Sequence, residues 1–356
     1  MHWSMFALAA LVLVAAYSLK VPKAGLGRLS SAMAFFGGLI ASALLIKMFA
    51  SEAGLDRTTE FDKFVNAAIV SAEQDPAPLI VFTGASYSRN GIDPERLTLA
   101  LKDLGYNYRV VSLSLEAASI LERDAHLKQF MNAIDRTPEI VFVEVSGAFD
   151  NKVAYMFGNS KFSQRAIEQF DLRTTAWTLL GLGNRACEGV SACIQDAGFL
   201  GLHSGLNFLN IGLVGKGETA SGAGAVPAYD PQFAPRYDLD PAEALNQAEA
   251  TPVIAKQWVR SFRYQQRERL RSEGVSHVAY YQPPMLYEGA RAYTEGLCDG
   301  ELAGEICIHS NDTGLMQALN GNYWYDHGHL LDAGTAIYNA WLIDQMIESG
   351  VLGPVS

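Results

Sequence analysis

The chain has 356 residues, of which 49% are hydrophobic and 18% are charged, with a formal net charge of −11 and a pI near 5.1. This length is sufficient for one or two domains with a large core. The acidic balance argues against a nucleic-acid partner, because phosphate binding needs clustered Lys and Arg side chains.

Two apolar stretches open the chain, at 5–19 and 32–46, and the basic loop KVPKAGLGR separates them. Basic loops stay in the cytoplasm, and a signal peptide would carry positive charge in its first residues, which MHWS lacks. We therefore expect a transmembrane hairpin over 1–50 in the bacterial inner membrane, with membrane lipid as a partner. The alternative is a single anchor that follows a cleaved or peripheral first segment. Both arrangements place the rest of the chain in the periplasm or extracytoplasmic space.

After a linker and leading helix at 51–77, apolar strands alternate with amphipathic helices. Strands are predicted at 78–86, 108–115, 139–147 and 275–284, and helices at 93–105, 119–135, 255–274 and 335–350. This alternation predicts an α/β domain over 78–356, with a doubly wound, mostly parallel sheet flanked by helices. The segment 215–241 is rich in Gly, Ala, Pro and Asp, and we expect a long surface loop or lid there.

The four cysteines fall into two local pairs, Cys187 with Cys193 and Cys298 with Cys307. In an extracytoplasmic protein this spacing predicts two small disulfide loops. The alternative is four unrelated buried thiols. A zinc site is disfavoured, because no C-x-x-C spacing is present.

Ser86 stands in GASYSRNG, directly after the first predicted strand. Reactive groups collect at the carboxyl ends of strands in doubly wound sheets, and a helix that follows supplies positive backbone potential. Ser86 is therefore a candidate nucleophile, although a serine is also common as the polar end of a strand. Arg89 and Asn90 either contact a substrate or cap the turn.

Asp326 and His329 are separated by two residues in YDHGHLLDAG, near the C-terminus. A D-x-x-H turn can direct the carboxylate at the imidazole, which selects the tautomer and stabilises the imidazolium. Asp326, His327 and His329 together form an alternative metal site, but no further ligand cluster accompanies them. We expect neither a metal nor a cofactor. The preceding aromatic residues, 323–325, either pack in the core or form a wall on which a sugar stacks.

GAS after the first strand and DHGHLLDAG before the last helix together resemble the two-ended pattern of the SGNH (GDSL-type) hydrolase and acyltransferase superfamily. GASYSRNGIDPERL is similar to the GSSR…GIDP opening of a membrane-anchored branch found with exopolysaccharide and cell-envelope acylation systems. VVSLSL, PEIVFVEVSGAFD, GVSHVAYYQPPM and YDHGHLLDAGTAIY extend the resemblance over most of 78–346. It implies a flavodoxin-like three-layer fold, with Ser86 as nucleophile, His329 as general base and Asp326 as the orienting acid.

The oxyanion-hole Gly and Asn of that superfamily are not evident, because 114–119 has no Gly and Ser146 and Gly147 stand in the second block. The amides of Ser86 and Ser146 are the candidate substitutes. The resemblance implies a serine-dependent O-acyl, and by preference O-acetyl, transferase or esterase. Its partners would be an acyl donor, a glycan acceptor and a multi-span membrane O-acyltransferase. The alternative is a catalytically weak binding or scaffold subunit of a polysaccharide modification or export complex.

Overall fold

A computed structural model describes residues 60–116, 118–145, 150, 172–183, 190–209, 255–286, 290–310 and 312–353, together with five isolated positions between 35 and 45. Five strands form one sheet in the order β2-β1-β3-β4-β5, and every neighbouring pair is parallel. The strands are β1 (Leu79–Thr83), β2 (Arg109–Ser112), β3 (Ile140–Glu144), β4 (His277–Gln282) and β5 (Ile306–His309). Their apolar sequences suit a parallel sheet that is covered on both faces.

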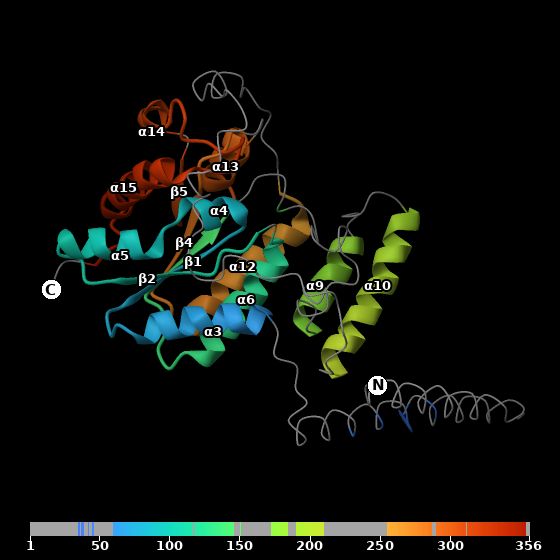
Figure 1. Cartoon of the computed structure of the whole chain (residues 1–356). Helices are drawn as coiled ribbons and strands as arrows, with labels where there is room; N and C mark the ends of the chain where they lie inside the picture. The colour runs from blue at the N-terminus through green and yellow to red at the C-terminus, as the bar shows by residue number, and fades with distance from the viewer. Residues whose placement is uncertain are drawn as a thin grey trace, which may run out of the picture.

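Helices cover both faces of the sheet (Figure 1). On one face lie α5 (Pro94–Asp103), α14 (Thr313–Ala318) and α15 (Asp332–Glu348). On the other lie α3 (Glu60–Glu73), α6 (Ile120–Ala133), α12 (Gln257–Ser272) and α13 (Ala290–Asp299). Each face encloses its own hydrophobic core, with Phe82 and Phe142 stacked in the first and Phe64 and Phe130 buried in the second. The prediction of a doubly wound α/β fold is confirmed.

In the described parts of the chain, three further helices lie outside these two layers. The short helix α4 (Ser86–Gly91) follows β1 directly, whereas α9 (Leu172–Gly183) and α10 (Val190–Leu209) lie side by side beyond α6 and α12 (Figure 1). The sequence patterns did not predict α4, α9, α10, α13, α14 or the edge strand β5. The predicted strands and helices are all present, with ends shifted by a few residues.

The chain crosses from one side of β1 to the other between β2 and β3, since β1 lies between them in the sheet. Such a switch point leaves a crevice at the carboxyl ends of the two central strands, where ligands of open α/β sheets bind. Ser86 begins α4, just after the carboxyl end of β1, and Glu144 is the last residue of β3. The fold therefore puts the predicted nucleophile at its expected position.

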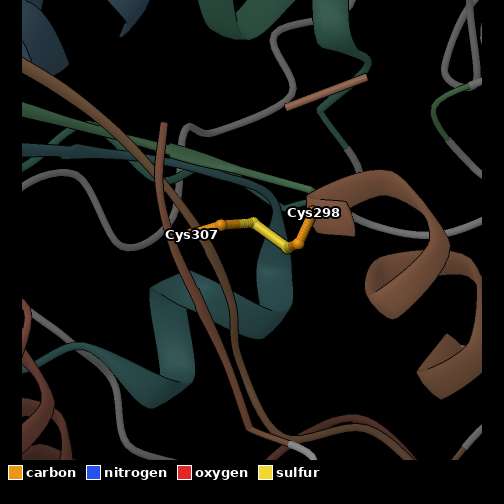
Figure 2. The surroundings of a disulfide bond; sticks show 2 residues. All are labelled: Cys298 and Cys307. Atoms are coloured by element: carbon orange, nitrogen blue, oxygen red, sulfur yellow. A yellow bond between two sulfur atoms is a disulfide. The ribbon is translucent and has the colours of Figure 1, made fainter. Parts of the chain in front are cut away.

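A disulfide joins Cys298 near the end of α13 to Cys307 in β5, with a Cα–Cα distance of 5.8 Å (Figure 2). This pairing was predicted and is confirmed. Cys193 is also disulfide-bonded, but Cys187 lies outside the described residues, so the pairing of those two stays a prediction.

Two other predictions cannot be compared with the structure: the loop at 215–241 lies outside the described residues, and so does the transmembrane hairpin over 1–50 apart from the five positions between 35 and 45. Within the parts of the chain that the structure describes, no helix is both long enough and apolar enough to cross a membrane.

Candidate active site

Residues 84–88 connect β1 to α4 and carry the candidate nucleophile Ser86, and we call this segment the nucleophile turn. Ser86 is the first residue of α4, and Ala85 in front of it is extended, with φ −94° and ψ −158°. The turn is tied to the neighbouring strand segment, because the Leu115 N–H donates to the Gly84 carbonyl over 3.1 Å. The side chain of Ser86 is thereby placed above the carboxyl edge of the sheet.

The D-x-x-H loop is closed by short-range contacts between its two sides. Trp324 and Leu330 form an antiparallel bridge, and the Tyr325 N–H donates to the His329 carbonyl over 2.8 Å. Trp324 is 1% exposed, and its indole N–H donates to the Leu319 carbonyl over 2.9 Å. Trp324 thus belongs to the hydrophobic core, as does the partly buried Tyr323 packed against it.

Helix α15 brings this loop to the nucleophile turn. Its Thr335 hydroxyl donates to the Asn90 carbonyl over 2.6 Å, and its Asn339 amide donates to the Gly91 carbonyl over 2.5 Å. Both acceptors lie at the end of α4. Residues almost 250 positions apart in the chain are therefore joined by buried hydrogen bonds, which carry weight in a low-dielectric interior.

Ser86, His329 and Asp326 form a continuous hydrogen-bonded chain. The Ser86 Oγ lies 2.8 Å from His329 Nε2, and His329 Nδ1 lies 2.7 Å from Asp326 Oδ1. The tautomer that satisfies both contacts carries its proton on Nδ1 and accepts the serine proton at Nε2. The ring of Tyr87 stacks on that of His329, with centroids 5.1 Å apart. This is the geometry in which a histidine can activate a serine hydroxyl.

The Asp326 carboxylate is held in its charged form. Burial acts to raise its pKa, but hydrogen bonds from the His329 ring and from the backbone N–H groups of Gly328 and His329 outweigh burial, so the pKa lies below its usual value. An ionised carboxylate next to Nδ1 favours the imidazolium that forms during proton transfer. The His329 and Asp326 side chains are 13% and 23% exposed, so solvent still reaches the site.

A second carboxylate, which is buried, lies beneath the nucleophile turn. Glu144 at the end of β3 is fully buried and accepts the Ala85 N–H over 2.8 Å and the Ser88 hydroxyl. The Tyr281 hydroxyl donates to Ser88 Oγ over 2.6 Å. Because Glu144 takes the Ala85 N–H, that amide does not face a substrate.

The remaining predicted residues are placed as follows. Arg89 is 7% exposed and pairs with Glu116 over 3.3 Å, and Asn90 is completely buried. Both therefore pack within the fold around α4. Ser146 lies outside the described residues, so its role in an oxyanion hole stays a prediction.

The structure gives no geometric support to the alternative metal site. Nδ1 of His329 faces Asp326 and Nε2 faces Ser86. Within the described ranges of the chain, no three His, Cys, Asp or Glu side chains gather where they could hold a metal ion.

The sequence motifs did not indicate Glu144, Tyr281 and Arg123, which lie beneath the nucleophile turn, or the contacts that Ser88 makes from within it. One signal was present: IVFVE ends an otherwise apolar, buried strand with a glutamate. Glutamate is almost never fully buried unless it is paired. That position therefore indicated a buried partner, although the sequence does not show which one.

Comparison with known proteins adds no relative, since neither a protein-family model nor a curated protein matches the chain. The fold and the site thus define the class of protein only as a parallel α/β protein with a Ser-His-Asp chain at the carboxyl edge of its sheet. The resemblance to the SGNH superfamily remains an expectation from short motifs.

Proposed function

We propose that this protein is a serine-dependent O-acyltransferase or esterase of the SGNH type, with an O-acetyl group as the expected cargo. The observation that carries the proposal is the hydrogen-bonded chain from Ser86 through His329 to Asp326. Its position at the switch point of the sheet adds support, because substrates of open α/β folds bind there.

In the proposed first half-reaction, Ser86 Oγ attacks the acyl carbonyl carbon while His329 Nε2 takes the hydroxyl proton. The Ser86 N–H, at the start of α4, is the candidate donor to the oxyanion. Collapse of the tetrahedral intermediate breaks the bond to the leaving group, which takes the proton from His329. The products are a free alcohol and an acyl-serine ester.

In the second half-reaction, the acceptor hydroxyl gives its proton to His329 and attacks the acyl-serine. Collapse of the second intermediate returns that proton to Ser86 Oγ and releases the new ester. A sugar hydroxyl as acceptor makes the protein a transferase, and water makes it an esterase. Exclusion of water from the site decides between the two.

The proposed setting is the outer side of the bacterial inner membrane, with a cell-envelope or secreted polysaccharide as acceptor. The Cys298–Cys307 disulfide supports an oxidising compartment, and the apolar stretches at 5–19 and 32–46 support a membrane anchor. A multi-span membrane O-acyltransferase that delivers the acyl group across the bilayer is the proposed partner.

Fluorophosphonate labelling of the purified full-length chain, read by intact mass, tests the proposal. We expect one adduct on the wild type and none on Ser86→Ala or His329→Ala. Ser272→Ala and His277→Ala are matched controls. Ser272 is exposed at the end of α12, and His277 is the first residue of β4, so it lies at the amino ends of the strands, away from the carboxyl ends where Ser86 lies. Both controls should label like the wild type.

A folded wild type without an adduct would overturn the catalytic proposal. It would favour the alternative, in which the same fold serves as a binding or scaffold subunit of a polysaccharide modification or export complex.

A further inference from the structure

The nucleophile turn is held from below by one buried carboxylate. Glu144 Oε2 accepts both the Ala85 N–H, at 2.8 Å, and the Ser88 hydroxyl. These two donors flank Ser86 on either side in the chain. The carboxylate therefore fixes the backbone before the nucleophile and the side chain after it.

Glu144 is itself fixed from the opposite side. Arg123 in α6 donates to Glu144 Oε1 over 3.3 Å and to the Glu144 carbonyl over 2.9 Å. Its second amino group donates to the buried Asp150 over 2.5 Å. A buried carboxylate needs such partners, because an uncompensated charge in the interior is costly.

There is no spare room around this contact. A Cβ atom at Gly84 would lie closer than 3.0 Å to both Ser88 and Glu144. Tyr281 closes the other side, because its hydroxyl donates to Ser88 Oγ. The turn therefore packs so closely on Glu144 that a side chain at position 84 would have to displace one of these contacts.

We propose that Glu144 is a positioning residue, which holds the nucleophile turn so that Ser86 Oγ faces His329 Nε2. The inference rests on the proposed function, in which Ser86 is the nucleophile. In this role Glu144 does not touch the substrate but acts through the Ala85 N–H and the Ser88 hydroxyl. Reaction rates are sensitive to such support, because a misplacement of 1 Å can cost about 100-fold.

Glutamine cannot replace Glu144 in all its contacts. If the amide oxygen faces Ala85 and Ser88, the amide NH₂ faces the Arg123 guanidinium, and both groups are donors. If the amide is turned over, the NH₂ meets the Ala85 N–H instead. Glu144→Gln therefore keeps the size of the side chain. In one orientation it loses the contact with Arg123, and in the other it loses the hydrogen bond from the Ala85 N–H.

The test measures two quantities during fluorophosphonate labelling of the full-length chain: the rate constant and the final labelled fraction. For Glu144→Gln we expect the rate constant to fall about 100-fold, with the same final fraction as the wild type. A merely structural role would lower the labelled fraction and leave the rate constant of the folded molecules unchanged. Ser88→Ala is the milder variant, with an expected loss of about 5- to 10-fold in rate constant.

The matched control is Glu139→Gln. Glu139 lies directly before β3, at the opposite edge of the sheet, where it accepts a hydrogen bond from Tyr108 over 2.9 Å. The control should retain the rate constant of the wild type. Equal rate constants for wild type and Glu144→Gln would overturn the inference.

Hydrogen exchange of the peptide Leu79–Gly91 separates failure of this inference from failure of the proposed function. Loss of the Glu144 contact should speed amide exchange in the turn, in Glu144→Gln and not in Glu139→Gln. If the wild type takes no label, the proposed function fails, and exchange still reports on the turn. Unchanged exchange in Glu144→Gln would overturn the positioning role by itself.

Discussion

Asp326 Oδ1 accepts three hydrogen bonds, from the backbone N–H groups of Gly328 and His329 and from His329 Nδ1. The two backbone donors decide what an asparagine would do at this position. They require an oxygen at the Oδ1 site, so the amide oxygen, and not the NH₂, would face the imidazole. The tautomer of His329 would then be preserved and only the charge would be lost.

For Asp326→Asn we therefore expect a modest decrease in fluorophosphonate labelling, by about 10-fold, since charged hydrogen bonds exceed neutral ones by roughly 1 to 1.5 kcal/mol. In Asp326→Ala the His329 ring also loses its orientation, so the labelling rate should fall on the order of 10⁴-fold. Labelling rates of the two variants check this. Equal losses would show that orientation by Asp326 contributes nothing beyond its charge.

A covalent link joins the edge strand β5 to the helix α13. The disulfide closes a short loop, with a sequence separation of 9, between α13 and β5 (Figure 2). Among the strands that the structure describes, β5 pairs with β4 alone, and it carries Cys307 in its four residues, ICIH. Cross-linking a loop of this length restricts the unfolded chain and stabilises the fold by about 2 to 3 kcal/mol in the chain-entropy description.

The double variant Cys298→Ser/Cys307→Ser should lower the free energy of unfolding by that amount, measured by denaturant titration. Its fluorophosphonate labelling in the absence of denaturant should be retained, because Cys307 packs against the core on the α3 and α6 face of the sheet, whereas the loop that carries His329 packs in the core on the α15 face. Chemical reduction of the wild type is not an equivalent experiment, because Cys193 is also disulfide-bonded. A double variant with wild-type stability would contradict the prediction.

At the scale of the whole molecule, a buried charge network ties one helical layer to the sheet. Arg123 in α6 pairs with Glu144 and Asp150, and Arg263 in α12 pairs with Asp150 over 2.6 Å and with Tyr293 of α13 over 2.9 Å. The network therefore connects β3 with three helices and ends directly beneath the nucleophile turn. Burial raises the pKa of Tyr293 to about 12 despite the neighbouring Arg263, so its hydroxyl remains protonated.

Arg123→Met should destabilise the protein by about 3 to 5 kcal/mol, because it leaves two buried carboxylates without their shared partner. Arg96→Met is the matched control, since Arg96 forms an ion pair with Asp332 in which both side chains are exposed, Arg96 by 36% and Asp332 by 55%. Such pairs contribute about 0 to 1 kcal/mol. Urea unfolding followed by circular dichroism measures both, and similar losses in the two variants would refute the argument.

The sequence alone was sufficient for the strands and helices with a clear period, and for the contact between Asp326 and His329, which lie three residues apart. The geometry of a short stretch of chain determines these strands and helices as well as this contact, so each can be predicted from one segment of the sequence. The helix at 93–105 is an example: Asp93 caps it, accepting the Arg96 N–H over 3.0 Å, as expected for Asp followed by Pro.

Tertiary structure decided which distant segments meet. Ser86 and His329 are separated by 243 residues, and the sequence related them only through a family resemblance. The contact of Glu144 with the nucleophile turn depends on β3 lying next to β1, and strand order is not encoded in any one segment. The short α4 was missed because its six residues are too few to show a helical hydrophobic period, and packing against α15 determines its conformation. The edge strand β5 is recognised by its pairing with β4 and by its disulfide to α13, and its sequence, ICIH, does not show either contact.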